Sequence, residues 1–223
     1  PVDRAKIVAN GVVPADMRNN VDSNIPVNLL KDQYITSKDG YTLSSAKAMQ
    51  LDIISSMVAQ GWKRPAYFAI TIPDEYYSYF ENQDGGYKFT TSAGMAYALT
   101  PINMLAYKSV GSGYTDKAYR NITEHYRWGG LDKATPGNVP YYDETAARMV
   151  NSTRISIVEA AQNLIKEAEM AADLKEHNDS LKVDVPARVM TDGFIADRYN
   201  KARTLLHLME QKLPWFAVNA SFS

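Results

Sequence analysis

The chain contains no cysteine, which excludes disulfide bonds, thiolate metal sites and a cysteine nucleophile. Its histidines, His125, His177 and His207, lie too far apart in the sequence to form a metal-binding motif. No apolar run is as long as a membrane span or has the apolar centre of a signal peptide. With 24 basic and 25 acidic residues the net charge is −1, so charge favours neither nucleic acid nor an anionic membrane. We therefore expect no metal, no cofactor and no nucleic-acid partner.

What is present is an ordinary globular composition. Of the 223 residues, 45% are hydrophobic and 22% are charged, which suits one large domain or two small ones with a real core. There are 15 tyrosines against 6 phenylalanines, so many rings should lie half-buried with the hydroxyl in water. Because the chain starts at Pro1 and carries no targeting segment, we expect it to be a processed piece of a longer protein.

Short helical and extended patterns alternate in residues 1–140. The stretch "LSSAKAMQLDIISSMVAQG", residues 43–61, has the apolar spacing of a helix, with Ser44 or Ser45 as N-cap and Gly61 as its stop. Two runs rich in strand-forming residues predict short strands near 66–72 and 94–100. The expected buried face of the helix consists of Met49, Ile53, Ile54, Met57 and Val58.

The stretch "GWKRPAYFAITIP", residues 61–73, joins this helix to the first strand. Gly61 ends the helix, and Pro65 keeps Arg64 out of the helical conformation. Trp62 then fills the core while Lys63 and Arg64 point into solvent. We favour this structural junction of Gly61, Trp62, Arg64 and Pro65 over a ligand site.

The pattern becomes helical from residue 141 onward. Residues 144–177 and 194–214 predict two helices that pack as an antiparallel hairpin. The first helix has an apolar stripe of Met149, Val150, Thr153, Ile157, Ala161, Leu164, Ile165 and Ala168, and the second has one of Ile195, Tyr199, Ala202, Leu205, Leu206 and Met209. The predicted fold is therefore α+β, with a small sheet and helices in residues 1–140 and a helical hairpin in residues 141–223.

Motifs that carry chemistry are missing from the sequence. It has no phosphate-binding loop, no GxSxG nucleophile turn and no HExxH helix. The acidic pairs Asp74-Glu75 and Asp143-Glu144 stand where helices start, where acids favour the helix dipole. We predict no catalytic residue in this chain.

A cluster of aromatic residues is the one candidate binding surface. It comprises Tyr76, Tyr77, Tyr79, Phe80 and Tyr87. Tyrosine faces stack well on sugars and bases, but packing against the strands explains the cluster equally well.

Four fragments, in order, resemble a known family: "GWKRPAYFAITIP", "GMAYALTPI", "DKAYRNITEHYRWGG" and "YYDETAARMVNSTR". They are similar to the soluble C-terminal region of a Bacteroidota membrane-protein family of protein O-mannosyltransferase-like type, whose membrane part is a domain of unknown function. The closing "YNKARTLLHLMEQKLP" resembles the second helix of a tetratricopeptide repeat. The resemblance spans about residues 41–214 and implies that the helical hairpin is tetratricopeptide-like.

This resemblance implies a parent protein embedded in the inner membrane that uses a lipid-linked sugar and carries its catalytic acids in the membrane part. The present chain would then be its non-catalytic periplasmic domain, which binds acceptor protein, glycan or another partner. Two alternatives stay open: a free-standing periplasmic protein-interaction module, and an independent hydrolase.

Overall fold

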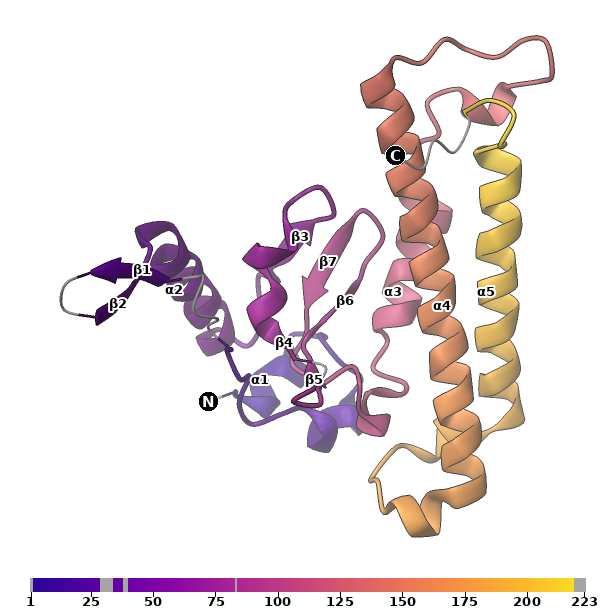
Figure 1. The fold of residues 1–223 in the computed structure, drawn as a ribbon. Helices are drawn as coiled ribbons and strands as arrows, with labels where there is room; N and C mark the ends of the chain where they lie inside the picture. The colour runs from indigo at the N-terminus through magenta and orange to yellow at the C-terminus, as the bar shows by residue number, and fades with distance from the viewer. Residues whose placement is uncertain (1, 29–33, 38–39, 83, 219–223) are drawn as a thin grey trace. The chain divides into compact units, whose positions relative to one another are not determined.

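The computed structural model describes residues 2–28, 34–37, 40–82 and 84–218 (Figure 1). By its contacts the chain divides into two units. Unit 1 comprises Pro1–Thr91, Ala96–Gly113 and Asp179–Pro186, and unit 2 comprises Ser92–Met95, Tyr114–Asn178 and Ala187–Ser223. Residues 114–140 thus group with the helical hairpin by contacts, whereas the sequence suggested a boundary at residue 140.

The described residues of unit 1 form the α-helices α1 and α2, short 3-10 helices and small antiparallel sheets (Figure 1). Its central sheet has the order β3-β7-β6, with Phe68 opposite Tyr97 in the antiparallel pairing of β3 and β7. Strand β3 lies inside the predicted stretch 66–72 and β7 inside 94–100. Two further pairs, β1-β2 and β4-β5, form separate two-stranded antiparallel sheets. The elements are α1 (Arg4–Ala9), β1 (Tyr34–Ser37), β2 (Gly40–Leu43), α2 (Ser45–Ala59), β3 (Tyr67–Ala69), β4 (Glu81–Asn82), β5 (Tyr87–Lys88), β6 (Thr90–Ser92) and β7 (Ala96–Leu99).

Helix α2 begins and ends as predicted, but its buried face differs. The Ser44 hydroxyl accepts a hydrogen bond from the Lys47 N–H, which caps the first turn. The core side of α2 is centred on Ile54 and Met57, which are 7% and 5% exposed. The prediction that Met49 and Ile53 are buried is wrong, because they lie beyond the edge of that side and are 67% and 65% exposed.

Unit 2 is built around a long helical hairpin (Figure 1). Helix α3 (Tyr114–Arg120) continues as a π-helix (Asn121–His125), and α4 (Glu144–Leu181) is interrupted at His177, whose φ and ψ of −123° and 19° are not helical. The Thr191 hydroxyl accepts from the Phe194 N–H and caps α5 (Asp192–Lys212). The α+β class with a C-terminal helical hairpin is therefore confirmed. A tetratricopeptide unit has about 34 residues for both helices, whereas α4 alone has 38, so that likeness stays a prediction.

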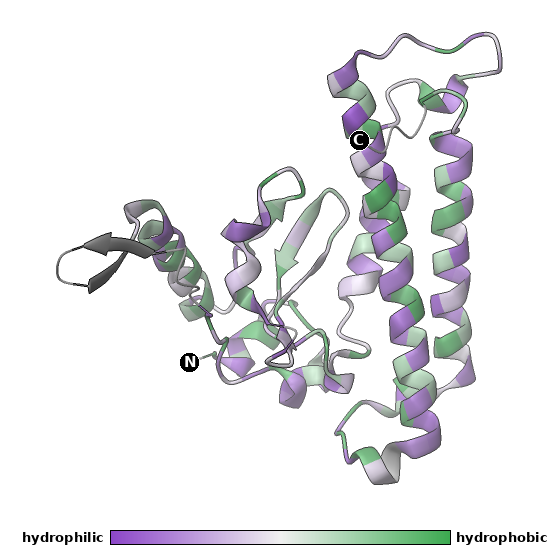
Figure 2. Ribbon diagram, in the orientation of Figure 1, coloured by the Kyte–Doolittle hydropathy of each residue, from purple (hydrophilic) through white to green (hydrophobic). Residues whose placement is uncertain are grey.

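The core of unit 2 is formed by α4 and α5, along which Figure 2 shows apolar residues, together with α3, the π-helix and the short helix Leu131–Lys133. Its buried residues are Ala118, Ile122, Leu131, Val150, Ile157, Ala160, Ala161, Leu164, Ala202, Leu205, Met209, Leu213 and Val218. Three residues of the predicted stripes are instead largely exposed: Met149 at 54%, Tyr199 at 44% and Leu206 at 37%. A charged residue also occupies the buried face of α5, because Arg198 lies on the same face of the helix as Ala202 and Leu205 and is buried like them.

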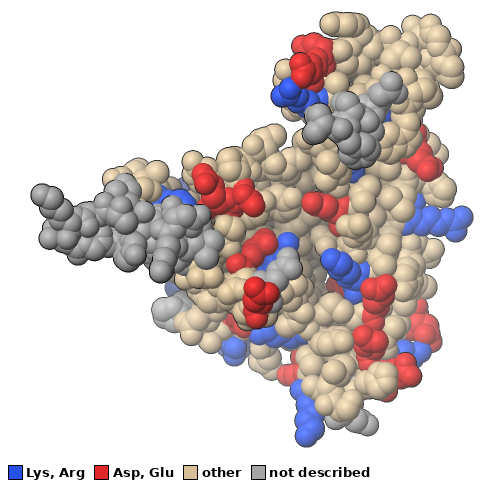
Figure 3. Space-filling view, viewed as in Figure 1, with Lys and Arg blue, Asp and Glu red and all other residues tan. Residues whose placement is uncertain are grey.

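The surface carries mixed charge. On the face drawn in Figure 3, acidic and basic side chains are interspersed. Among the residues that the structure describes, no helix combines the length and the apolar character needed to cross a membrane.

Candidate functional site

Two residues of the predicted aromatic cluster belong to the core of unit 1. Tyr79 and Phe80 are each 1% exposed, and their ring centroids lie 4.6 Å apart. Burial raises the pKa of Tyr79 to about 12, since a phenolate would lose its hydration there. These two rings therefore support the sheet and cannot meet a ligand at the surface.

The other three rings of the cluster reach the surface. Tyr76 is 39% exposed, and Tyr77 and Tyr87 are half-buried. The Tyr77 ring packs against Phe68 at 5.8 Å and against Tyr97 at 5.1 Å, measured between centroids. Tyr77 thus lies beside β3 and β7, whereas Tyr87 of β5 packs against Phe89 with 6.1 Å between the ring centroids.

The junction after α2 is held by Trp62. This side chain is 2% exposed, and its indole N–H donates to the Leu99 carbonyl at 3.1 Å. Gly61 has a φ of +66°, and a Cβ there would lie 2.5 Å from the Cβ of Lys6, so only glycine lets α1 approach. Arg64 and Pro65 are exposed. Trp62 is therefore a core residue, as the sequence suggested.

The turn Ser92–Met95 is bound by polar groups of unit 2. Asn121 Nδ2 donates to the Ala93 carbonyl at 3.0 Å, and the Ser156 hydroxyl donates to the Gly94 carbonyl. Gly94 has a φ of +100°, and a Cβ at this position would lie 2.5 Å from the Tyr126 hydroxyl oxygen. Burial raises the pKa of Tyr126. The glycine of the "GMAYALTPI" fragment thus gives the backbone room beside the tyrosine.

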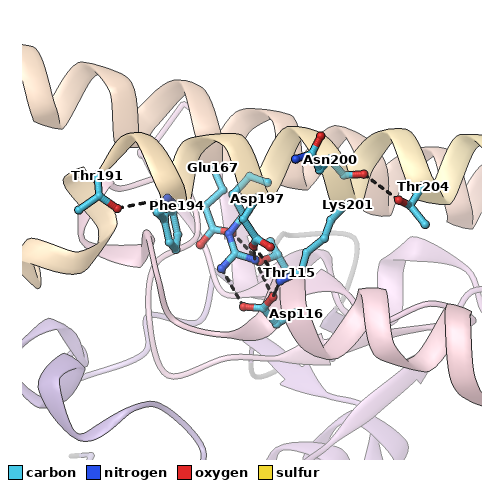
Figure 4. Close-up of polar contacts among 10 residues, drawn as sticks. Thr115, Asp116, Glu167, Thr191, Phe194, Asp197, Asn200, Lys201 and Thr204 are labelled. Atoms are coloured by element: carbon cyan, nitrogen blue, oxygen red, sulfur yellow. Dashed lines mark hydrogen bonds and ion pairs between the residues drawn. The ribbon is translucent and has the colours of Figure 1, made fainter.

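A group of paired charged side chains in unit 2 joins α3, α4 and α5 (Figure 4). Arg198 of α5 binds Asp116 of α3 through two contacts, Nη1 to Oδ1 at 2.6 Å and Nη2 to Oδ2 at 2.9 Å. Lys201 Nζ also donates to Asp116 Oδ1 at 2.6 Å. Arg198 Nε lies 3.3 Å from Glu167 Oε2 of α4, and that carboxylate accepts a hydrogen bond from the Thr115 hydroxyl. We call these five residues the three-helix ion network.

Most of this network is shielded from water. The side chains of Arg198 and Glu167 are 5% and 7% exposed, and the guanidinium stacks on the Phe194 ring at 4.3 Å. Burial alone would raise the pKa of Asp116, but hydrogen bonds and charge from Arg198 and Lys201 outweigh it and lower the pKa. Burial likewise opposes the charge on Arg198, while Asp116 and Glu167 raise its pKa overall. Each charge is therefore stabilised by its partners, which fits a structural role and offers no free group for acid–base chemistry.

A second buried arginine secures the end of α5. Arg154 of α4 is 3% exposed and donates to the carbonyls of Leu213, Pro214 and Val218 at distances of 2.7–3.3 Å. Its remaining donor binds Asn151 Oδ1 at 2.8 Å, and the guanidinium lies 4.2 Å from the centre of the Trp215 ring. The positive charge thus meets carbonyls at a helix C-terminus, where the helix dipole favours a cation.

Possible metal ligands do not gather in the part of the chain that the structure describes, where no three His, Cys, Asp or Glu side chains lie together. His125, His177 and His207 are all exposed. Glu176 Oε1 lies 4.0 Å from His177 Nε2, and Glu210 Oε2 lies 3.6 Å from His207 Nδ1.

Comparison with known families identifies the first half of the chain. The model of the family described as TMEM260-associated domain 2 matches residues 1–118, which is more than half of the 223 residues. The chain belongs to this family. Searches among curated proteins and among solved structures found no significant match.

The TMEM260-associated domain 2 match includes most of the features singled out in unit 1. It covers the junction of Gly61 and Trp62, the whole aromatic cluster and the fragments "GWKRPAYFAITIP" and "GMAYALTPI". It ends within α3, just after Thr115 and Asp116. Family membership therefore characterises this chain as an accessory domain of a TMEM260-like protein.

Sequence reasoning missed the residues that organise unit 2. Arg154, Glu167 and Arg198 are charged, so a search for apolar stripes passed over them. Their spacing was nevertheless informative, since Arg198, Ala202 and Leu205 follow one another at intervals of four and three residues on one helix face. A charged residue in register with a buried stripe is a signal for a paired internal charge.

Proposed function

We propose that this chain is a non-catalytic extracytoplasmic accessory domain of a membrane-bound glycosyltransferase of protein O-mannosyltransferase-like type. The single observation that carries the proposal is the TMEM260-associated domain 2 match over residues 1–118. The fragments quoted from the sequence support it, because they resemble a periplasmic region of such proteins in Bacteroidota. On this proposal the membrane part performs sugar transfer and this chain contributes binding.

The binding surface in this proposal consists of the accessible tyrosines Tyr76, Tyr77 and Tyr87, and its ligand is a glycan or the acceptor protein that carries it. Tyr76 has 39% of its surface accessible, while Tyr77 is fixed by Phe68 and Tyr97. Rings that are held rigidly lose little freedom when a sugar stacks on them. With few stacked rings the affinity for a monosaccharide should be weak, about millimolar.

The proposal is tested by titrating the isolated chain with mannosides and glycopeptides while its amide shifts are followed by NMR. We expect shifts centred on residues 76–87 and a several-fold weaker affinity for Tyr76→Ala. Tyr141→Ala is a matched control, since Tyr141 is 91% exposed and belongs to unit 2. Shifts elsewhere, or equal affinities for both variants, would reject the tyrosine surface.

Catalysis is tested separately with a lipid-linked sugar and an acceptor peptide. We expect no turnover by this chain alone and turnover by the full-length parent. Transfer by the isolated chain that is lost on changing one of its own carboxylates would contradict the accessory role. Location is tested with alkaline phosphatase fused to the parent at this domain, because that enzyme needs disulfides that form outside the cytoplasm.

A further inference from the structure

We propose that the buried pair of Glu167 and Arg198 sets the register in which α4 and α5 pack, as a conformational lock built into unit 2. This inference is independent of the proposed function. It rests on the position of the pair within the seam between the helices, on the character of the apolar residues around it, and on the connection of Arg198 to α3.

The pair occupies seam positions that would suit apolar side chains. On α5, Arg198 is 4% exposed and continues the buried row of Ala202, Leu205 and Met209. On α4, Glu167 is 7% exposed and stands between the fully buried residues Leu164 and Ala171. A buried charge is tolerated only where an opposite charge lies beside it. Few alternative packings of the two helices would meet that condition.

The apolar part of the seam discriminates less sharply between registers than a buried charge pair does. The buried cluster of unit 2 contains Ala160, Ala161 and Ala202 beside the larger Ile157, Leu164, Leu205 and Met209. A slip by one helical turn would set larger side chains where alanines now stand, which costs packing energy but leaves apolar groups among apolar neighbours.

The ion pair distinguishes these registers sharply. A slip by one turn moves α5 by about 5.4 Å along α4. Arg198 Nε now lies 3.3 Å from Glu167 Oε2, so the slip would leave both groups buried without each other. The cost of isolating two buried charges makes the observed register the preferred one, as a single polar pair does in coiled coils.

The same arginine extends the lock to α3. The two contacts between Arg198 and Asp116, at 2.6 and 2.9 Å, hold the start of α3 at this level of the hairpin. Thr115, the neighbour of Asp116, donates to Glu167. Because α3 thereby contacts both helices of the pair, its position also depends on the register.

The test replaces the buried polar groups by apolar ones of similar size in the variant Thr115→Val/Glu167→Met/Arg198→Met. Asp116 keeps its partner Lys201 in this variant. Since the chain has no cysteine, spin labels can be attached at Ala172→Cys and Arg203→Cys, exposed positions on α4 and α5. Each label lies five residues beyond Glu167 or Arg198, and the two helices run in opposite directions, so the labels are about 15 Å apart along the hairpin axis. Because this offset makes up most of the distance between the labels, a slip along the axis changes that distance by nearly its own length.

We expect one narrow distance distribution for the labelled native sequence. For the apolar variant we expect a folded protein with a second population displaced by about 5 Å, one helical turn. The matched control is Lys175→Met/Asp192→Asn, which removes an exposed ion pair of 2.6 Å between the same two helices. It should keep the single native distance.

Three results would overturn the lock. One is a single native distance in the apolar variant, since alanine and leucine packing would then suffice to fix the register. Another is an equal displacement in the control, which would show that any ion pair between these helices acts in the same way. The third is an apolar variant that no longer folds, because the network would then supply stability rather than register.

Discussion

Arg198 and Asp116 lie 82 positions apart in the sequence and meet in a two-contact ion pair of 2.6 and 2.9 Å that links α5 to α3. The same guanidinium faces Glu167 of α4 at 3.3 Å. One side chain therefore connects the three main helices of unit 2. Because it is buried, its removal leaves Glu167, which is 7% exposed, without this cation.

The first prediction concerns Arg198→Met. This change leaves Glu167 buried without its cation and should lower the free energy of unfolding by about 3–5 kcal/mol. Arg203→Met on the exposed side of α5 is the control and should change it by less than about 0.5 kcal/mol. Urea unfolding followed by circular dichroism measures both. Equal stabilities of the two variants would show that the Arg198 pairing contributes nothing.

The second prediction concerns acid stability and Asp116. The pKa of Asp116 is lowered in the folded protein, so its ionised form stabilises the fold. This contribution is complete at pH values above the pKa of the unfolded chain, about 3.9. That contribution is lost as the pH falls through the lower folded pKa. The stability difference between the native sequence and Asp116→Asn should therefore be constant between pH 7 and 5 and should shrink below about pH 4.

Unfolding midpoints in urea at a series of pH values measure this difference. Asp132→Asn serves as a comparison, since Asp132 pairs with Lys212 at a longer distance of 3.6 Å. A difference for Asp116→Asn that grows on acidification would mean that burial, rather than pairing, dominates the pKa of this carboxyl.

Much of the fold could be predicted from local patterns in the sequence. Helices α2, α4 and α5 follow from apolar spacing and from caps such as Ser44, and the strands around Phe68 and Tyr97 follow from runs of strand-forming residues. These signals are local because each depends on residues within a few positions of one another. The α+β class is a direct consequence of their order.

What escaped prediction depends on distant partners. Periodicity shows that α2 has an apolar side, but only tertiary contacts decide that Ile54 faces the core while Ile53 does not. Tyr79 and Tyr76 are similarly placed in the sequence, yet one is core and the other surface. Arg154 and Arg198 read as ordinary surface cations until the C-terminal carbonyls or Asp116 are seen beside them.

The third prediction concerns the junction after α2. Trp62→Ala removes a ring that is 2% exposed and a hydrogen bond to Leu99, so it should cost about 3–5 kcal/mol of stability. Lys63→Ala, the next residue, is exposed and should cost less than about 0.5 kcal/mol. Denaturant melts of the two variants decide between a core residue and a surface site. A Trp62→Ala variant as stable as Lys63→Ala would restore the ligand-site interpretation.

The last prediction concerns the contact of Gly94 with Tyr126. In Gly94→Ala the new methyl would stand 2.5 Å from the Tyr126 hydroxyl oxygen, on a backbone whose φ is +100°. Gly129→Ala is the matched control, since its φ of +59° is also positive but no atom lies within 4 Å of the added Cβ. Gly94→Ala should therefore lose about 1–3 kcal/mol more than the control, the usual cost of overpacking. Combining it with Tyr126→Phe removes the oxygen that the methyl meets and should recover part of this excess, with a coupling energy of at least about 0.5 kcal/mol. Strictly additive effects in that double-mutant cycle would show that backbone strain alone, and not the tyrosine, requires glycine at this turn.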